Sequence, residues 1–136
     1  MNRKLLTITV LLSLVAVWLV GNNAAAKQDF RVVSASLEAS PTTSVTCPAL
    51  VTFKGKIEAT DKGRVKYTWS YSDGASGPDG FVDFEGPGVK YVETTWRLGD
   101  PTILPHYDGF AMLKILSPNP YESNRAKFTV DCKQGG

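Results

Sequence analysis

Residues 49–59, ALVTFKGKIEA, alternate apolar and polar side chains with a period of two. Val51 and Phe53 fall on one face of an extended chain and Lys54 and Lys56 on the other, because successive side chains of a strand point to opposite faces. The same alternation recurs between clusters of Gly, Pro, Asp and Asn, while helical periodicity is almost absent after the N-terminal apolar run. The chain is therefore predicted to be all-β.

Seven segments carry this alternation, and turn-forming residues separate them. They are residues 29–39, 49–59, 64–71, 81–85, 89–98, 110–116 and 125–132. Seven short strands in about 105 residues fit a two-sheet antiparallel sandwich of the immunoglobulin-like type. We therefore expect residues 27–136 to form one immunoglobulin-like β-sandwich domain.

The N-terminal residues 1–26 have the three parts of a secretory signal peptide. Arg3 and Lys4 precede an apolar run over residues 5–20, and a small-residue stretch ends at Ala26, where we place the cleavage. An uncleaved membrane anchor is the alternative, but the run is shorter than the roughly 20 apolar residues that a bilayer requires. The mature chain is therefore expected to be secreted or periplasmic, with no stable membrane anchor after cleavage.

Charge narrows the class of partner. Over the whole chain 15 Lys and Arg stand against 13 Asp and Glu, and Arg3 and Lys4 account for that difference. The mature chain is thus formally neutral and has no basic run or basic amphipathic helix, so neither nucleic acid nor a membrane surface is an expected partner. The expected partner is an unknown protein or glycan at the cell surface.

The two cysteines, Cys47 and Cys132, predict a disulfide, because an exported chain matures in an oxidising compartment. Two free thiols are the alternative. Cys47 precedes the second predicted strand and Cys132 ends the seventh, so the bond would clamp the ends of two strands rather than cross the core between them. In the chain-entropy model, a loop of this length is worth up to about 4.5 kcal/mol.

A specific order of residues gives a resemblance that covers residues 45–132. Its markers are Cys47-Pro48, Phe53-x-Gly55-x-Ile57, Tyr67-x-Trp69, Ser72-Asp73-Gly74, Thr95-Trp96, Leu116-Ser117-Pro118-Asn119, Ser123-Asn124-x-Ala126-x-Phe128 and Val130-x-Cys132. This order resembles small disulfide-linked immunoglobulin-like domains of exported bacterial proteins. Such domains have no assigned activity and are regarded as binding or spacer modules, so the resemblance implies a fold and brings no catalytic residue with it.

Catalytic chemistry has little support in the sequence. Nucleophilic catalysis needs a Ser or Cys beside an oriented base, but the chain holds one histidine, His106, and no nucleophile-elbow motif. We therefore expect no enzyme activity, no cofactor and no catalytic residue.

Four acidic residues form a candidate ligand or cation loop: Asp73, Asp79, Asp83 and Glu85. Calcium needs several converging oxygens, and Asp83 and Glu85, two residues apart on one strand face, would alternatively suit a hydrolase acid/base pair. The spacing matches no established calcium loop, and Asp-Gly pairs are ordinary turn residues. The sequence therefore assigns no metal site here.

Aromatic residues are the third candidate. Tyr67 and Trp69 share a face with Val65 and are expected in the core. Trp96 is also expected to be buried; if exposed with Tyr91 or Tyr107, it would provide a stacking surface for sugar or peptide. Trp96 and Tyr107 are thus the candidate aromatic contacts.

The pattern as a whole favours an exported, non-catalytic binding or interaction module. Scaffold loops vary while strands hold the core, so residues 72–80 and 99–109 are the expected contact surface. The alternatives are a structural or spacer component of the cell envelope and, with less in its favour, a small hydrolase that uses Asp83 and Glu85.

Overall fold

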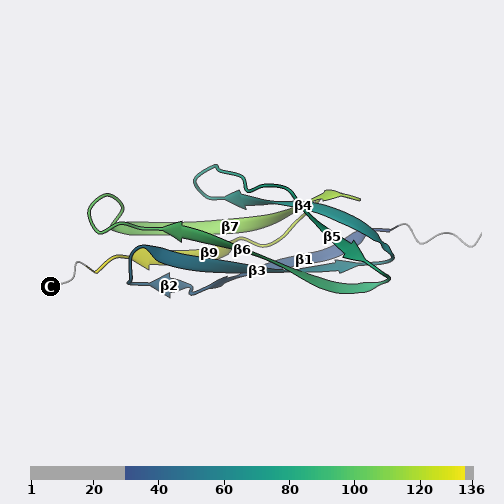
Figure 1. Cartoon of the computed structure of the whole chain (residues 1–136), viewed down its shortest axis with the longest axis horizontal. Helices are drawn as coiled ribbons and strands as arrows, with labels where there is room; N and C mark the ends of the chain where they lie inside the picture. Colours follow the sequence, from purple (N-terminus) through teal and green to yellow (C-terminus); the bar gives the residue numbers. More distant parts are fainter. Residues whose placement is uncertain (1–29, 134–136) are drawn as a thin grey trace, which may run out of the picture.

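The computed structural model describes residues 30–133, and nine β-strands make up the regular structure of that part of the chain (Figure 1). The strands are β1 (Val32–Ser40), β2 (Thr43–Ser44), β3 (Ala49–Ala59), β4 (Gly63–Tyr71), β5 (Gly80–Phe84), β6 (Gly88–Leu98), β7 (His106–Ser117), β8 (Tyr121–Glu122) and β9 (Ala126–Asp131). Most of them run along the long axis of the molecule.

The strands form two sheets. One has the order β1-β3-β6, and the other has the order β2-β9-β7-β4-β5, with β8 paired to β7. If only the seven longer strands are counted in chain order, the first, second and fifth (β1, β3 and β6) form one sheet. The other four form the second sheet, in which the fourth (β5) pairs with the third (β4). This arrangement is that of an immunoglobulin-like sandwich, so the predicted all-β two-sheet fold is confirmed.

Three details differ from the sequence prediction. The strands β2 and β8 have two residues each, too few for a period of two to be read from the sequence. The pair β2–β9 is parallel, with Thr43 opposite Thr129, whereas all the other pairs among the described strands are antiparallel. Finally, β7 begins at His106, so the connection expected over residues 99–109 ends at residue 105.

Gly109 explains the last difference. An Asp-Gly pair indicates a turn in the sequence, but here Gly109 lies inside β7, opposite Phe128 of β9. A Cβ at Gly109 would lie 2.9 Å from the Phe128 ring and closer still to the Tyr107 ring. The strand thus uses glycine because two aromatic rings occupy the space where a side chain would be.

The core lies between the sheets and contains the inward faces that the alternation predicts. In β3 the buried residues include Val51, Phe53 and Ile57, and Trp69 of β4 is buried opposite them. The Phe53 ring packs edge-on against Phe128, with centroids 5.6 Å apart. At Gly55 the two sheets come so close that a Cβ would lie 2.8 Å from Cδ2 of Leu113.

The predicted disulfide is present between Cys47 and Cys132, whose Cα atoms are 5.5 Å apart. Cys47 lies just before β3 in one sheet and Cys132 just after β9 in the other, so the bond clamps the two sheets at one end. Gly99 passes directly beside it with φ +95°, and a Cβ there would lie 3.0 Å from Cys47 Sγ. Both the conformation and the space at this position favour glycine.

Two asparagine side chains close the outer edge of β1. Asn119 Oδ1 accepts a hydrogen bond from Val32 N at 2.8 Å, and its Nδ2 donates to Val32 O at 3.0 Å. Asn124 makes the same pair of bonds with Leu37, at 2.9 Å each. Each amide thereby replaces a neighbouring strand at one residue of the edge.

The predicted signal peptide, residues 1–26, lies outside the described residues and stays a prediction. Within residues 30–133, no helix has the length and apolar character that crossing a membrane requires. The disulfide between Cys47 and Cys132 is of the kind that persists in oxidising compartments.

Candidate functional site on the outer face of the three-stranded sheet

The four candidate acids do not come together. Asp73 Oδ1 accepts a hydrogen bond from Ala75 N at 2.8 Å in a local turn, and Asp79 lies 3.5 Å from the ammonium of Lys66. No group of three or more His, Cys, Asp or Glu side chains is arranged to hold a metal ion among residues 30–133. The loop is therefore held by separate local interactions.

Asp83 is committed to an exposed ion pair. Arg64 Nε donates to Asp83 Oδ1 at 2.7 Å, and Arg64 Nη2 donates to Oδ2 at 3.2 Å. The hydrogen bonds from Arg64 hold the pKa of Asp83 below its usual value. A general acid needs a raised pKa, so this geometry does not favour a hydrolase acid/base pair of Asp83 and Glu85.

The two aromatic candidates join the rim of the core. Trp96 is half-buried rather than buried, and its ring centroid lies 4.7 Å from that of Tyr71 and 5.6 Å from that of Phe128. Tyr107 packs at 5.8 Å from Trp96, and its hydroxyl lies 2.9 Å from Ser72 Oγ. These contacts leave neither ring as an open platform on the surface.

His106 belongs to an exposed charge cluster on β7 and β9. Its Nε2 lies 3.0 Å from Asp108 Oδ2, and its Nδ1 lies 3.8 Å from Asp131 Oδ1. The hydrogen bond and the charge of Asp108 raise the pKa of His106, with a smaller contribution from Asp131. Asp108 is in turn bound by Thr129 Oγ1, which donates at 2.7 Å.

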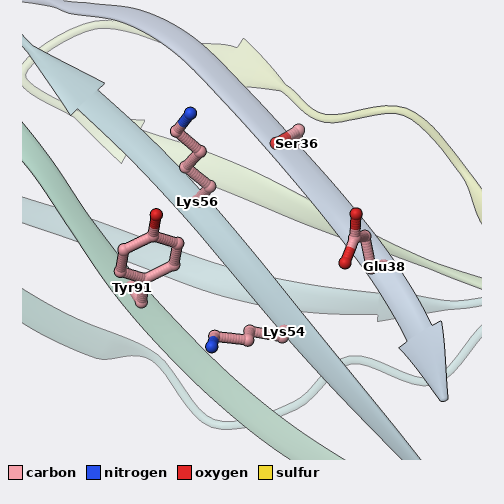
Figure 2. Close-up of a pocket in the computed structure, with 5 residues that line it drawn as sticks. All are labelled: Ser36, Glu38, Lys54, Lys56 and Tyr91. Atoms are coloured by element: carbon pink, nitrogen blue, oxygen red, sulfur yellow. The ribbon is translucent and has the colours of Figure 1, made fainter.

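A different surface combines an exposed aromatic ring with charged groups. An open depression lies on the outer face of the sheet β1-β3-β6, and Figure 2 shows the five residues that line it. They are Ser36 and Glu38 from β1, Lys54 and Lys56 from β3, and Tyr91 from β6. Strand pairing brings them together, since Lys56 stands opposite both Ser36 and Tyr91.

Tyr91, on the strand β6, lines one side of this depression. Tyr91 is 59% exposed and lies on the outer face of the sheet, whereas the buried residues of the neighbouring strand β3 lie on the inner face. The ammonium of Lys54 lies 5.0 Å from the Tyr91 ring centroid, within the range of a cation–π contact. Figure 2 shows the Tyr91 ring between the two lysines, with its hydroxyl on the side of Lys56.

Both lysines keep their charge available. Neither Lys54 nor Lys56 forms an ion pair with another residue in the part of the chain that the structure describes. Glu38 also makes no ion pair there, although it stands opposite Lys54 on the neighbouring strand. The depression therefore offers an aromatic face, two ammonium groups, two hydroxyls and a carboxylate.

The sequence placed Lys54 and Lys56 on the polar face of their strand but could not show this site. Its residues are separated by up to 55 positions, and only the register of β1, β3 and β6 makes them neighbours. For Tyr91, the sequence alone indicates only a possible aromatic contact beside Trp96.

No protein-family model matches this chain, and no curated protein matches its sequence. Among solved structures it is similar to the CARDB domain of the PF1109 protein from Pyrococcus furiosus, solved in complex with di-metal ions. The identity is 10%, the TM-score is 0.55, and the match covers 74% of this chain and 94% of that one. The similarity shows the fold alone, and that fold is immunoglobulin-like.

A second match is to the alkylpurine DNA glycosylase AlkC of Pseudomonas fluorescens. It has 14% identity and covers 72% of this chain but 30% of that one. Its TM-score of 0.39 is too low to indicate a shared fold.

Proposed function

We propose that this protein is an exported, non-catalytic immunoglobulin-like module that binds an acidic glycan in the depression around Tyr91. The observation that carries the proposal is the exposed Tyr91 ring beside two lysines that form no ion pair within residues 30–133. Aromatic rings bind the apolar faces of sugars, and ammonium groups bind carboxylate or sulfate.

Each lining group has a role in this proposal. The Tyr91 ring stacks on one sugar, and the Lys56 ammonium, on the hydroxyl side of Tyr91, binds the acidic substituent. The Ser36 hydroxyl and the Glu38 carboxylate bind sugar hydroxyls, as donor or acceptor and as acceptor respectively. Lys54, over the ring, adds positive potential to the same site.

We do not propose a metal site by analogy with the CARDB domain, which was solved with di-metal ions. Residues 30–133 contain no cluster of three metal-binding side chains, and the depression has one carboxylate, Glu38. Export is supported by the predicted signal peptide and by the disulfide between Cys47 and Cys132.

Binding is tested by titration calorimetry with the protein purified after export. Acidic oligosaccharides, carrying carboxylate or sulfate, are compared with neutral ones of the same length. We expect saturable binding of the acidic compounds, weakened by salt and lost in Tyr91→Ala and in Lys56→Ala. Lys62→Ala is the matched control, because Lys62 is an exposed lysine in the turn between β3 and β4, away from the depression.

Three outcomes would overturn parts of this proposal. Equal binding of neutral and acidic sugars, or binding that survives Lys56→Ala, would remove the acidic glycan as the ligand. Release of shortened oligosaccharides by the wild type, abolished in Asp83→Asn, would show that the protein is an enzyme.

A further inference from the structure

The strand β6 has an open edge. It pairs with β3 at every position from Gly88 opposite Ala59 to Leu98 opposite Ala49, without a register shift. No other strand in the described range pairs with it, and no side chain or loop backbone there bonds to it. One row of backbone N–H and C=O groups along an 11-residue strand therefore faces outward.

The other sheet edges among the described strands are short or closed. Asn119 and Asn124 bond to the edge of β1, as described above. In the second sheet the outermost strands are β5, with five residues, and β2, with two. An exposed edge that is long and regular is a template for pairing with another strand, and β6 alone has those properties here.

The outer face of β6 carries opposite charges at a spacing suited to self-pairing. Glu93 and Arg97 are both exposed, share the outward face of the strand, and form no ion pair within residues 30–133. When two copies of β6 pair antiparallel about a two-fold axis at Thr95, Glu93 of each copy stands opposite Arg97 of the other. The axis thus generates two identical cross-strand ion pairs.

The inward face fits the same axis. Val92 of one copy then stands opposite Leu98 of the other, and Thr94 stands opposite Trp96. Trp96 is half-buried in the single chain, so a neighbouring strand would cover the remaining part of its ring. Moving the axis to Glu93 would instead place that carboxylate opposite itself, which disfavours that register.

We propose that two copies of this chain pair through β6 about an axis at Thr95 and join their three-stranded sheets into one six-stranded sheet. The axis lies between Glu93 and Arg97, the paired stretch runs from Val92 to Leu98, and Lys90, an exposed charge at the start of β6, stays outside it. The interaction is isologous, so it closes at the dimer and does not continue as a fibre.

The dimer would also strengthen the binding of an acidic glycan. This one consequence rests on the proposed function. Tyr91 is four residues from the axis, so two Tyr91 depressions would lie on one continuous face, roughly 27 Å apart along the strand direction at about 3.4 Å per residue. A single acidic polysaccharide could occupy both, and the second contact would be intramolecular, which strengthens binding without new contacts.

The pairing is tested by sedimentation velocity of the exported protein over a wide concentration range, without glycan. We expect a concentration-dependent dimer in the wild type. Glu93→Arg places two Arg–Arg contacts at the interface, and Arg97→Glu places two Glu–Glu contacts, so each should weaken the dimer about 30-fold. Lys62→Glu, a charge reversal on a distant turn, should leave it unchanged.

The decisive measurement mixes the two reversed variants. In an equal mixture of Glu93→Arg and Arg97→Glu, every charge again faces its opposite, so a heterodimer should form at concentrations where each variant alone is mainly monomeric. The double variant Glu93→Arg/Arg97→Glu should likewise dimerise with itself. A wild type that stays monomeric at all concentrations would overturn the proposal, as would a dimer that both single variants leave intact.

This test is independent of the glycan test. Lys56→Ala, on β3 and away from the edge, should abolish glycan binding and leave the dimer intact. A dimer without glycan binding would remove the proposed ligand alone, and glycan binding by a permanent monomer would remove the proposed pairing alone.

Discussion

Gly55 lies where the two sheets come close together, and replacing it with alanine tests the packing of the core directly. A Cβ at this position would lie 2.8 Å from Leu113 Cδ2, 3.0 Å from Val92 Cγ2 and 3.6 Å from Leu37 Cδ1. The first two distances are too short, and all three neighbours are buried side chains that have little room to move.

The cost of Gly55→Ala is the difference between two effects. Overpacking a filled core destabilises by about 1–3 kcal/mol, while alanine in a strand regains roughly 0.5–1 kcal/mol of the entropy that glycine loses on folding. We expect a net loss of about 1–2 kcal/mol in the free energy of unfolding. For a domain of this size, that lowers Tm by roughly 4–15 °C.

Equilibrium denaturation in urea measures the loss as a lower midpoint at an unchanged slope. Gly86→Ala is the matched control, because nothing lies within 4 Å of a Cβ at Gly86. The same chemical change there should be neutral or slightly stabilising. Leu113→Val, which removes the methyl that the new Cβ meets, should make the Gly55→Ala substitution less costly in its background. Equal effects at Gly55 and Gly86, or simple additivity with Leu113→Val, would refute this account of the packing.

Two further predictions concern the disulfide and the single histidine. Replacing Cys47 and Cys132 together with alanine should lower the free energy of unfolding by up to about 4.5 kcal/mol, and denaturation of the wild type with and without reductant should show a similar difference. The pKa of His106, followed by NMR as the only histidine signal, should lie above 6.5 and fall when Asp108 is changed to Asn. Because the folded-state pKa is raised, the stability from protonated His106 is fully present below about pH 6.5 and is lost as pH rises through that raised value. His106→Gln should remove this dependence of stability on pH. If the pKa of His106 is unchanged in Asp108→Asn, Asp108 is not the cause of the raised pKa.

The sequence predicted where the strands lie along the chain better than it predicted which strands pair with one another. The bounds of β3 were predicted to the residue, because its buried positions alternate with outward ones, most of them polar or charged, along the whole strand. The disulfide also followed from the sequence, since two cysteines in a chain that is predicted to be exported have one partner each. These features depend on local pattern and on compartment.

The candidate site depends on pairing between distant segments, which local pattern does not encode. Ser36, Lys56 and Tyr91 form one row across three strands, and a register shifted by two residues would keep every face but separate them. The open edge of β6 was hidden for the same reason, because an edge strand and a central strand can share the same alternation. The acidic residues, by contrast, are close together in the sequence and were therefore candidates for one ligand or cation loop. In the structure, Asp73, Asp79 and Asp83 each bind a different partner.

The position of the disulfide also determines how the domain would respond to mechanical force. The described chain enters β1 at one end of the sandwich, where Phe30 lies beside Phe84, and leaves β9 at the opposite end (Figure 1). Under tension between those ends, the Cys47–Cys132 bond carries the force, so residues inside this covalent loop cannot be extended.

Of the described residues ahead of the covalent loop, residues 30–46 can then unravel, and the force must first shear β1 from β3. About 17 residues at roughly 3.4 Å each lengthen the chain to roughly 60 Å over that segment and no further. The oxidised domain would therefore behave as a tether with a fixed maximum length, whereas the reduced domain could unravel completely.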